Sequence, residues 1–159
     1  MIMATKTNAV RLVQQANIPC RESFYEFDEQ DLSGTHAAQA IGMPPEQVFK
    51  TLVARGEKTG INVFCIPVCC ELDLKKAAKA AGDKNMELVA VKELLGLTGY
   101  IRGGCSPVGM KKNYPTFLDE TCILWDEIAI SAGARGHQMI LNPEALARLV
   151  DAEIVDLIQ

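Results

Sequence analysis

The sequence predicts a mixed α/β fold in a single domain that spans residues 1–159. The chain length of 159 residues lies within the usual size of one domain. Hydrophobic residues make up 48% of the chain, which is enough for one core. Apolar patterns of helical and of strand spacing alternate along the sequence. We therefore expect a mostly antiparallel sheet, or a partial barrel, surrounded by helices.

The N-terminal residues are expected to form a helix, a strand and a second helix. Thr7 can cap a helix that reaches about residue 17. Residues 20–27 alternate in the manner of a strand. A short helix is predicted over residues 35–41, where Gly42 can end it by taking a left-handed conformation.

The middle of the chain is expected to contain a hairpin and two helices. Residues 48–55 and 61–68 are apolar runs separated by a glycine-containing loop, a pattern typical of a β-hairpin. Asp73 can cap a helix over residues 74–81. A weaker helical pattern covers residues 91–95.

The C-terminal part is expected to contain strands followed by one helix. Strands are predicted at residues 116–118 and 122–125, and a second hairpin joins residues 128–132 to 137–141. Asn142 and Pro143 have the residue types of an N-cap and a first helical position, so a last helix should extend to about residue 150.

The net charge of −4 limits the partners that we expect. Proteins that grip many phosphates are usually basic, so tight general binding to nucleic acid is not expected. No apolar run reaches the ~20 residues of a membrane span. Residues 1–6 lack the pattern of an export signal, so we predict a cytoplasmic protein without a membrane contact.

The six cysteines are expected to be free thiols, because a reducing compartment disfavours disulfides. Cys65, Cys69 and Cys70 lack the C-x-x-C spacing of common zinc sites. With two histidines in the chain, His36 and His137, we predict neither a metal nor any other cofactor.

Lys50 is the first candidate functional residue, because it interrupts a run that is apolar on both faces. One interpretation, favoured by the pattern alone, is that its side chain reaches solvent at the edge of the strand. The alternative is that Lys50 points into a pocket, where its ammonium could bind a phosphate, a carboxylate or a developing oxyanion.

The glycine-rich loop at residues 103–109 is the second candidate feature. Its backbone N–H groups could hold an oxyanion or a phosphate, or its glycines could serve turn geometry alone. The loop matches neither the P-loop nor the dinucleotide-binding pattern. Cys105 and Ser106 could be nucleophiles, but no G-x-S-x-G motif is present and no histidine is adjacent, so a covalent triad is not expected.

Four segments, in this order and spacing, resemble the YbaK/ProX family of trans-editing aminoacyl-tRNA deacylases. Residues 45–52 resemble its lysine strand, and residues 71–80 its following helix. Residues 99–112 resemble its signature loop, and residues 131–136 its late hairpin. The resemblance extends from about Thr7 to the C-terminus.

The resemblance implies a fold related to the editing domain of bacterial prolyl-tRNA synthetases. It also implies cleavage of an amino acid wrongly esterified to tRNA for proline, either by hydrolysis or by substrate-assisted release. Cysteine is the expected amino acid, and in the second case its own thiol is the attacking group. The implied catalytic residues are Lys50, Gly103 and Gly104. The implied substrate-binding residues are Tyr25, Thr51, Cys105, Ser106, Pro107, Gly109 and His137.

Two departures from the family pattern leave the specificity open. His137–Gln138 stands where some relatives carry an Asp, and Ser33 stands where some carry an aromatic residue. A deacylase for alanine on the same tRNA is therefore an alternative, because pockets distinguish one methylene by only ≈ 1–3 kcal/mol. A non-catalytic module that binds a nucleotide or a synthetase is another. The acidic charge predicts weak binding to tRNA, and the resemblance then implies prolyl-tRNA synthetase as a partner that holds the tRNA.

Overall fold

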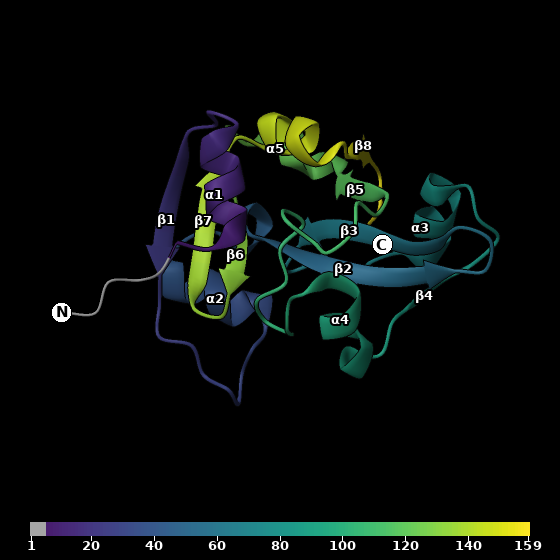
Figure 1. Cartoon of the computed structure of the whole chain (residues 1–159), viewed down its shortest axis with the longest axis horizontal. Coiled ribbons are helices and arrows are strands. Elements are labelled where there is room, and N and C mark those ends of the chain that lie inside the picture. Colours follow the sequence, from purple (N-terminus) through teal and green to yellow (C-terminus); the bar gives the residue numbers. More distant parts are fainter. Residues whose placement is uncertain (1–5) are drawn as a thin grey trace.

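A computed structural model describes residues 6–159 as a mixed α/β domain with two sheets (Figure 1). The predicted absence of an export signal concerns residues 1–6, of which 1–5 lie outside the described part. No helix within residues 6–159 has both the length and the apolar character to cross a bilayer. The same residues contain no cluster of three or more His, Cys, Asp or Glu side chains suited to a metal ion.

The smaller sheet has the strand order β1-β7-β6, and both of its pairings are antiparallel. Its strands are β1 (Cys20–Phe24), β6 (Ile128–Ala134) and β7 (His137–Leu141). The hairpin predicted near the C-terminus is therefore confirmed. β6 is longer than expected because an irregular register between Ser131 and Ala134 adds residues to the strand.

The larger sheet has the order β4-β2-β3-β5-β8. Its strands are β2 (Phe49–Gly56), β3 (Gly60–Pro67), β4 (Met86–Leu88), β5 (Thr116–Asp119) and β8 (Glu153–Val155). β2 pairs antiparallel with β3 and β4, whereas β3–β5 and β5–β8 are parallel. Over both sheets of the described chain, four strand pairings are antiparallel and two are parallel, so the mostly antiparallel arrangement is confirmed.

The described strands form two sheets where one sheet or a partial barrel was expected, and only one β-bridge links the two sheets within residues 6–159. A single parallel bridge joins Val48, just before β2, to Ala129 of β6. β2 then diverges from β6, so the strands do not close into a barrel. Figure 1 shows the two sheets side by side, with the long β2–β3 hairpin extending away from the smaller sheet.

The five predicted helices are all present, with bounds α1 (Asn8–Gln15), α2 (Gly34–Ile41), α3 (Leu74–Ala81), α4 (Val91–Thr98) and α5 (Pro143–Val150). The predicted caps are confirmed. Thr7 accepts a hydrogen bond from the Val10 N–H, Asp73 accepts two from the start of α3, and Asn142 accepts one from Ala145.

The strand predicted at residues 122–125 is wrong, because residues Glu120–Leu124 form a 3₁₀ helix. The Asp119 carboxylate caps this helix by accepting a hydrogen bond from the Thr121 N–H. Cys122 is buried, whereas Ile123 and Leu124 are exposed, so this apolar run does not cross the core.

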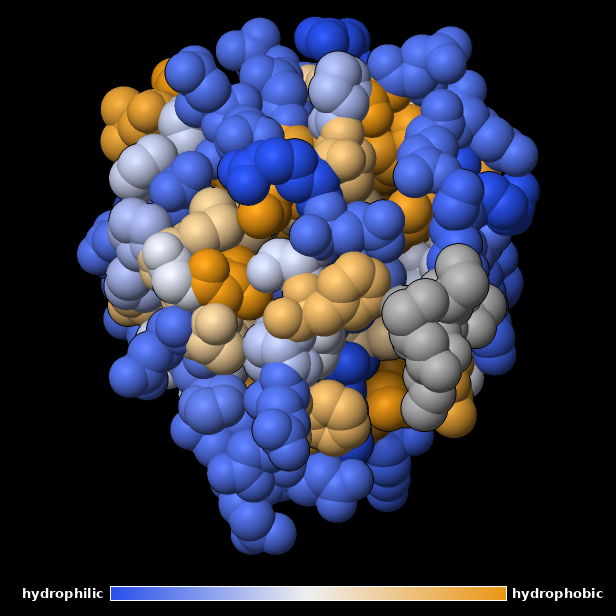
Figure 2. Space-filling model, turned by 90° about the vertical axis from the view of Figure 1, so that its left-hand side faces the viewer, coloured by the Kyte–Doolittle hydropathy of each residue, from blue (hydrophilic) through white to orange (hydrophobic). Residues whose placement is uncertain are grey.

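Side chains on both faces of the β2–β3 hairpin are buried, as expected of central strands. Phe49 and Val53 belong to the main core, which α1 and the smaller sheet complete. Phe64 and Ile66 of β3 point to the opposite face and pack with Ala77 of α3 in a second core. On the face in Figure 2, hydrophobic residues lie in several small patches between hydrophilic ones.

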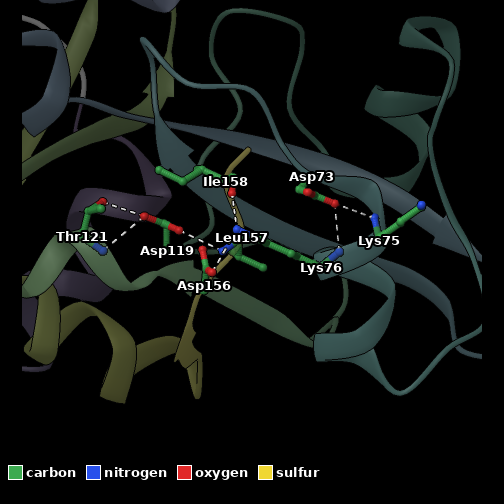
Figure 3. Close-up of polar contacts among 8 residues, drawn as sticks. All are labelled: Asp73, Lys75, Lys76, Asp119, Thr121, Asp156, Leu157 and Ile158. Carbon is green, nitrogen blue, oxygen red and sulfur yellow. Dashed lines mark hydrogen bonds and ion pairs between the residues drawn. The ribbon is translucent and has the colours of Figure 1, made fainter.

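The C-terminal segment is held against the larger sheet by polar contacts around Asp119 (Figure 3). The buried Asp119 carboxylate accepts hydrogen bonds from Thr121 Oγ1 at 2.6 Å and from the Leu157 N–H at 2.9 Å. The Lys76 ammonium donates to the Ile158 carbonyl at 2.6 Å and pairs with Asp156 at 2.9 Å. These contacts fix Leu157, which is fully buried in the second core.

Candidate active site

A pocket of about 400 Å³ lies along one edge of β2 and is the candidate active site. This volume is within the range of pockets that hold small ligands. Both sheets, the start of α2, the start of α4 and the glycine-rich loop contribute to its wall. The residues that line it and are used below are Tyr25, Ser33, Gly34, Thr35, Lys50, Thr51, Val68, Arg102, Gly103, Cys105, Ser131 and Gln138.

The pocket exists because the β2 edge is only partly paired. β4 pairs with Ala54–Gly56, and the Val53 carbonyl accepts a hydrogen bond from the Val89 N–H at 3.0 Å. Peptide groups of alternate residues point to the same edge of a strand, so Thr51 directs its N–H and C=O the same way as Val53. On this edge the β4 pairing covers only Ala54–Gly56, and no backbone hydrogen bond outside the strands within residues 6–159 involves Thr51.

Lys50 lies in the wall of this pocket and is half-buried. It is opposite Ile66 in the β2–β3 ladder, well inside the hairpin. The structure therefore places Lys50 among the residues that line the pocket, which is the position required by the second of the two interpretations left open by the sequence. An ammonium group in such a position favours a negatively charged or strongly polarised ligand atom.

The glycine-rich loop has one glycine in the pocket and another packed behind it. Gly103 lines the pocket and has a φ of +86°, which disfavours any other residue. Gly104 lies against the β6–β7 hairpin, where a Cβ would be 3.1 Å from the backbone of Ala134 and Arg135. Gly104 was expected to take part in catalysis. Its N–H, however, already donates to the Ile101 carbonyl at 2.9 Å and is therefore not free for a ligand.

The loop is held in place by its own contacts. The Tyr100 hydroxyl donates to the Val108 carbonyl at 2.5 Å, and the Val108 N–H donates to the Ser106 hydroxyl at 3.2 Å. The Arg135 guanidinium donates to the Arg102 carbonyl at 2.9 Å. The backbone at Gly103 is therefore preorganised rather than free to move.

Several predicted site residues lie outside this pocket. Ser106 is completely buried in the loop, and Gly104 is behind it. Pro107 and Gly109 line a separate cavity of about 320 Å³ on the other side of the loop. His137 is 4% exposed, lies 2.8 Å from Glu22 through Nε2 and stacks on Phe24 at 4.2 Å between ring centroids.

The predicted residues that the fold brings together are Tyr25, Lys50, Thr51, Gly103 and Cys105. Burial raises the pKa of the Cys105 thiol to about 12, so this thiol is protonated at neutral pH and is a poor nucleophile. The Thr51 hydroxyl is 3.7 Å from the sulfur of Cys65, whose pKa burial also raises to about 12. Neither thiol is suited to covalent catalysis.

Ser131 and Gln138 line the pocket but were not predicted as site residues. They are paired across the β6–β7 hairpin, so both side chains point to the same face. Gln138 is 6% exposed, and its amide oxygen has no hydrogen-bond partner within residues 6–159. A buried acceptor without a partner is costly, so Gln138 is a candidate for a polar contact with a bound ligand. In the sequence, the departure from the family pattern at Gln138 was the signal that could have identified this residue as part of the pocket wall.

The pocket is cationic although the chain as a whole is acidic. Lys50 and Arg102 line it, whereas none of its lining residues within the described chain is Asp, Glu or His. A cationic, partly enclosed cavity stabilises negative charge that develops on a bound ligand. The same composition provides no carboxylate or imidazole to act as a general base.

Comparison with known sequences agrees with this geometry. Residues 32–149 match the aminoacyl-tRNA editing domain. A protein of Enterococcus faecalis (strain ATCC 700802 / V583), named "Putative Cys-tRNA(Pro)/Cys-tRNA(Cys) deacylase EbsC", is 46% identical over 96% of this chain and 93% of its own length. The "Uncharacterized protein YwhH" of Bacillus subtilis (strain 168) is 25% identical over 77% of each chain.

Solved structures share the fold over nearly the whole chain. One, described as "a putative trans-editing enzyme for prolyl tRNA synthetase", has a TM-score of 0.79 at 28% identity and covers 98% of this chain and 99% of its own. The hypothetical protein APE2540 has a TM-score of 0.84 over 94% of this chain and 97% of its own, and at 20% identity it supports the fold alone. The match to the editing domain and the identity to the enterococcal protein together show that this chain belongs to the aminoacyl-tRNA editing domain family.

Proposed function

We propose that this protein is a trans-editing deacylase that removes a mischarged small amino acid, cysteine in the first place, from tRNA for proline. The observation that carries the proposal is the pocket, which combines Lys50, Gly103 and the open peptide groups of Thr51 without a general base. The enterococcal relative carries a name with this activity.

The pocket suits the 3′ end of an aminoacylated tRNA rather than its body. A volume of about 400 Å³ can hold an aminoacyl group and part of the terminal nucleoside. The net charge of −4 disfavours extended contact with the phosphates of the tRNA stem. Recognition is therefore concentrated at the ester.

Each group in the pocket has a distinct role in this proposal. The Lys50 ammonium binds the terminal phosphate or adenosine and holds the ester, and it is not a nucleophile. The Gly103 N–H donates to the ester carbonyl oxygen as negative charge develops there. The peptide groups of Thr51 and the amide of Gln138 bind the α-amino end of the aminoacyl group.

Ester cleavage needs little further help, because an aminoacyl ester is already activated. With cysteine as substrate, its thiol attacks the ester carbonyl carbon. A C–S bond forms, the C–O bond to the terminal ribose breaks, and the thiol proton passes to the departing oxygen. Holding the thiol and the carbonyl in this orientation supplies most of the acceleration. The cysteines of the protein take no part.

A partner protein would compensate for the weak binding of this acidic protein to tRNA. Prolyl-tRNA synthetase, which binds the same tRNA, is the partner that we propose, and both would act in the cytoplasm. If the purified protein alone bound tRNA in the nanomolar range at physiological salt, this part of the proposal would fail.

The deciding experiment measures deacylation of Cys-tRNA and Ala-tRNA for proline by the wild type and by Lys50→Ala. We expect the wild type to clear Cys-tRNA and Lys50→Ala to be slower by about 100-fold or more, the cost of removing one preorganised charge-stabilising group. Lys75→Ala removes an exposed lysine of α3 that does not line the pocket, so it should retain full activity.

The other outcomes are equally informative. Clearance of Ala-tRNA alone would retain the role of Lys50 and change the amino acid. An equal rate for Lys50→Ala and the wild type would remove Lys50 from the mechanism. Absence of activity on both substrates, with and without prolyl-tRNA synthetase, would favour the non-catalytic binding module.

A further inference from the structure

Cys69 and Cys70 form a pair of adjacent thiols that the proposed reaction does not use. Their Sγ atoms are 3.8 Å apart. Cys69 is exposed and Cys70 is half-buried, whereas Cys65, Cys105 and Cys122 are buried. An exposed thiol next to a second thiol is the arrangement of cysteines that undergo reversible oxidation.

The pair lies in a turn that is packed against the wall of the pocket. The Cys70 N–H donates to the Pro67 carbonyl at 3.0 Å, which closes the turn at the end of β3. Val68, inside this turn, lines the pocket and donates its N–H to the Val48 carbonyl at 2.8 Å. Val68 also occupies the space above Gly34, where a Cβ would be 2.3 Å from Val68 Cγ1.

The surroundings of Cys70 disfavour its thiolate form. Burial, the neighbouring Cys69 and the Asp119 carboxylate raise the pKa of the Cys70 thiol to about 11, and Lys50 acts in the opposite direction. Cys70 is the less accessible partner, so Cys69 is the thiol that meets a reagent from solution first.

We propose that Cys69 and Cys70 are a reversible thiol–disulfide modification site for low-molecular-weight disulfides. In the first step the Cys69 thiolate attacks the small disulfide, forms a mixed disulfide and releases one thiol. In the second step the Cys70 sulfur attacks Cys69 Sγ, the Cys69–Cys70 bond forms and the second thiol leaves. The protein loses two protons and two electrons, and the small disulfide gains them as it becomes two thiols.

The adjacency of the two residues makes this modification reversible. Cα atoms joined by a trans peptide are about 3.8 Å apart, closer than the ≈ 4.4–6.8 Å of most disulfides. A disulfide under such constraint is readily reduced again, as in regulatory rather than structural bridges. The Cys69–Cys70 disulfide closes a small ring that includes the peptide bond between the two residues. Closure of this ring rearranges the turn that carries Val68, and so it alters the pocket wall beside Lys50.

The test uses the full-length protein and glutathione disulfide as the probe. After reaction, acid quenching, denaturation and alkylation of free thiols, peptide mass spectrometry identifies the state of each cysteine. Fragment ions are needed because Cys65 lies in the same tryptic peptide. We expect the wild type to lack two hydrogens at Cys69–Cys70, to carry no glutathione there and to be restored by dithiothreitol.

Single variants separate the two steps. Cys70→Ser should stop at a lasting glutathione adduct on Cys69, and Cys69→Ser should leave Cys70 unmodified over the same time. Cys20, a partly exposed thiol on β1, is the internal control for unspecific reaction. Circular dichroism confirms that each variant is folded.

Three results would overturn the inference: a persistent glutathione adduct on wild-type Cys69, no reaction at the pair, or equal modification of Cys20 and Cys69. The readout is mass rather than deacylation, so it is independent of the proposed function. If the reduced protein and the protein with the Cys69–Cys70 disulfide also differ in deacylation rate, that difference measures the effect of the modification on the pocket.

Discussion

Gln138 is a residue at which stability and binding are expected to oppose each other. Its amide oxygen is buried without a partner, and its side chain lines the pocket. Such an atom lowers the stability of the free protein by roughly 1–3 kcal/mol and becomes useful once a ligand donates to it. Residues with this property concentrate at functional sites.

We expect Gln138→Met to raise the free energy of unfolding by about 1 kcal/mol, because an apolar group of similar shape removes the unpaired acceptor. The same change should lower kcat/KM for deacylation about 10-fold, by loss of one hydrogen bond to the substrate. Urea denaturation and steady-state kinetics measure the two effects.

Gln47→Met is the matched control, since Gln47 Nε2 donates to the Glu127 carbonyl at 2.8 Å outside the pocket. It should lose stability and keep its activity. If Gln138→Met behaved like this control, Gln138 would be a structural residue.

At the scale of single elements, the β2–β3 hairpin is held by Asp83, which lies beyond α3 in the sequence. The Asp83 carboxylate accepts hydrogen bonds from the Thr59 N–H at 2.8 Å, the Thr59 hydroxyl at 2.7 Å and the Lys58 N–H at 3.0 Å. A Cβ at Gly56 would be 2.1 Å from this carboxylate, which explains the glycine.

These contacts predict a pH dependence of stability. Desolvation would raise the pKa of Asp83, but the hydrogen bonds from Thr59, Lys84 and Lys58 outweigh it and lower the pKa well below its usual range. A lowered folded-state pKa gives stability that is present above the unfolded value of about 4 and is lost as the pH falls below it.

Asp83→Asn should therefore lower Tm at pH 7, and the difference from the wild type should shrink as the pH falls below about 4. Thermal unfolding followed by circular dichroism between neutral and acidic pH checks this. Glu46→Gln, at an exposed carboxylate without a hydrogen bond among the described residues, should leave Tm unchanged at every pH. A constant difference between Asp83→Asn and the wild type would contradict the linkage.

At the scale of the whole molecule, the C-terminal segment completes the second core. Leu157 is fully buried and packs in one cluster with Phe64 and Phe117, far away in sequence. Leu157→Ala should destabilise the protein by about 2–5 kcal/mol, the usual cost of a cavity at a buried leucine. Leu124→Ala, at a leucine that is 76% exposed, should change stability little. Similar urea midpoints for the two variants would show that the segment is dispensable.

Local signals in the sequence were sufficient for most elements. Thr7, Asp73 and Asn142 cap helices through contacts within three residues, so the pattern alone identifies them. The separation into two sheets and the strands β4 and β8 were missed. β8 has three residues and is defined by its pairing with β5, a long-range contact that no local pattern encodes.

The candidate site was predictable in part for a similar reason. Lys50 and the glycine-rich loop are unusual as sequence, and the pocket includes Lys50 and Gly103. The unpaired edge of β2 beside Lys50 depends on where β4 stops, and the exclusion of Ser106 and His137 from the pocket depends on tertiary packing. Ser131 and Gln138 are ordinary residues until the hairpin register brings them to one face.

The partly paired edge of β2 has a consequence beyond catalysis, for the solubility of the protein. An uncovered strand edge is a template for strands of other chains and so promotes aggregation. Here the part of the β2 edge that β4 does not pair is enclosed by the start of α2, the start of α4 and the glycine-rich loop. These segments leave a cavity instead of an accessible flat edge. The same three segments therefore protect the chain from association between copies. Displacement of any of them would expose an unpaired strand edge, which can pair with another chain, together with the substrate site.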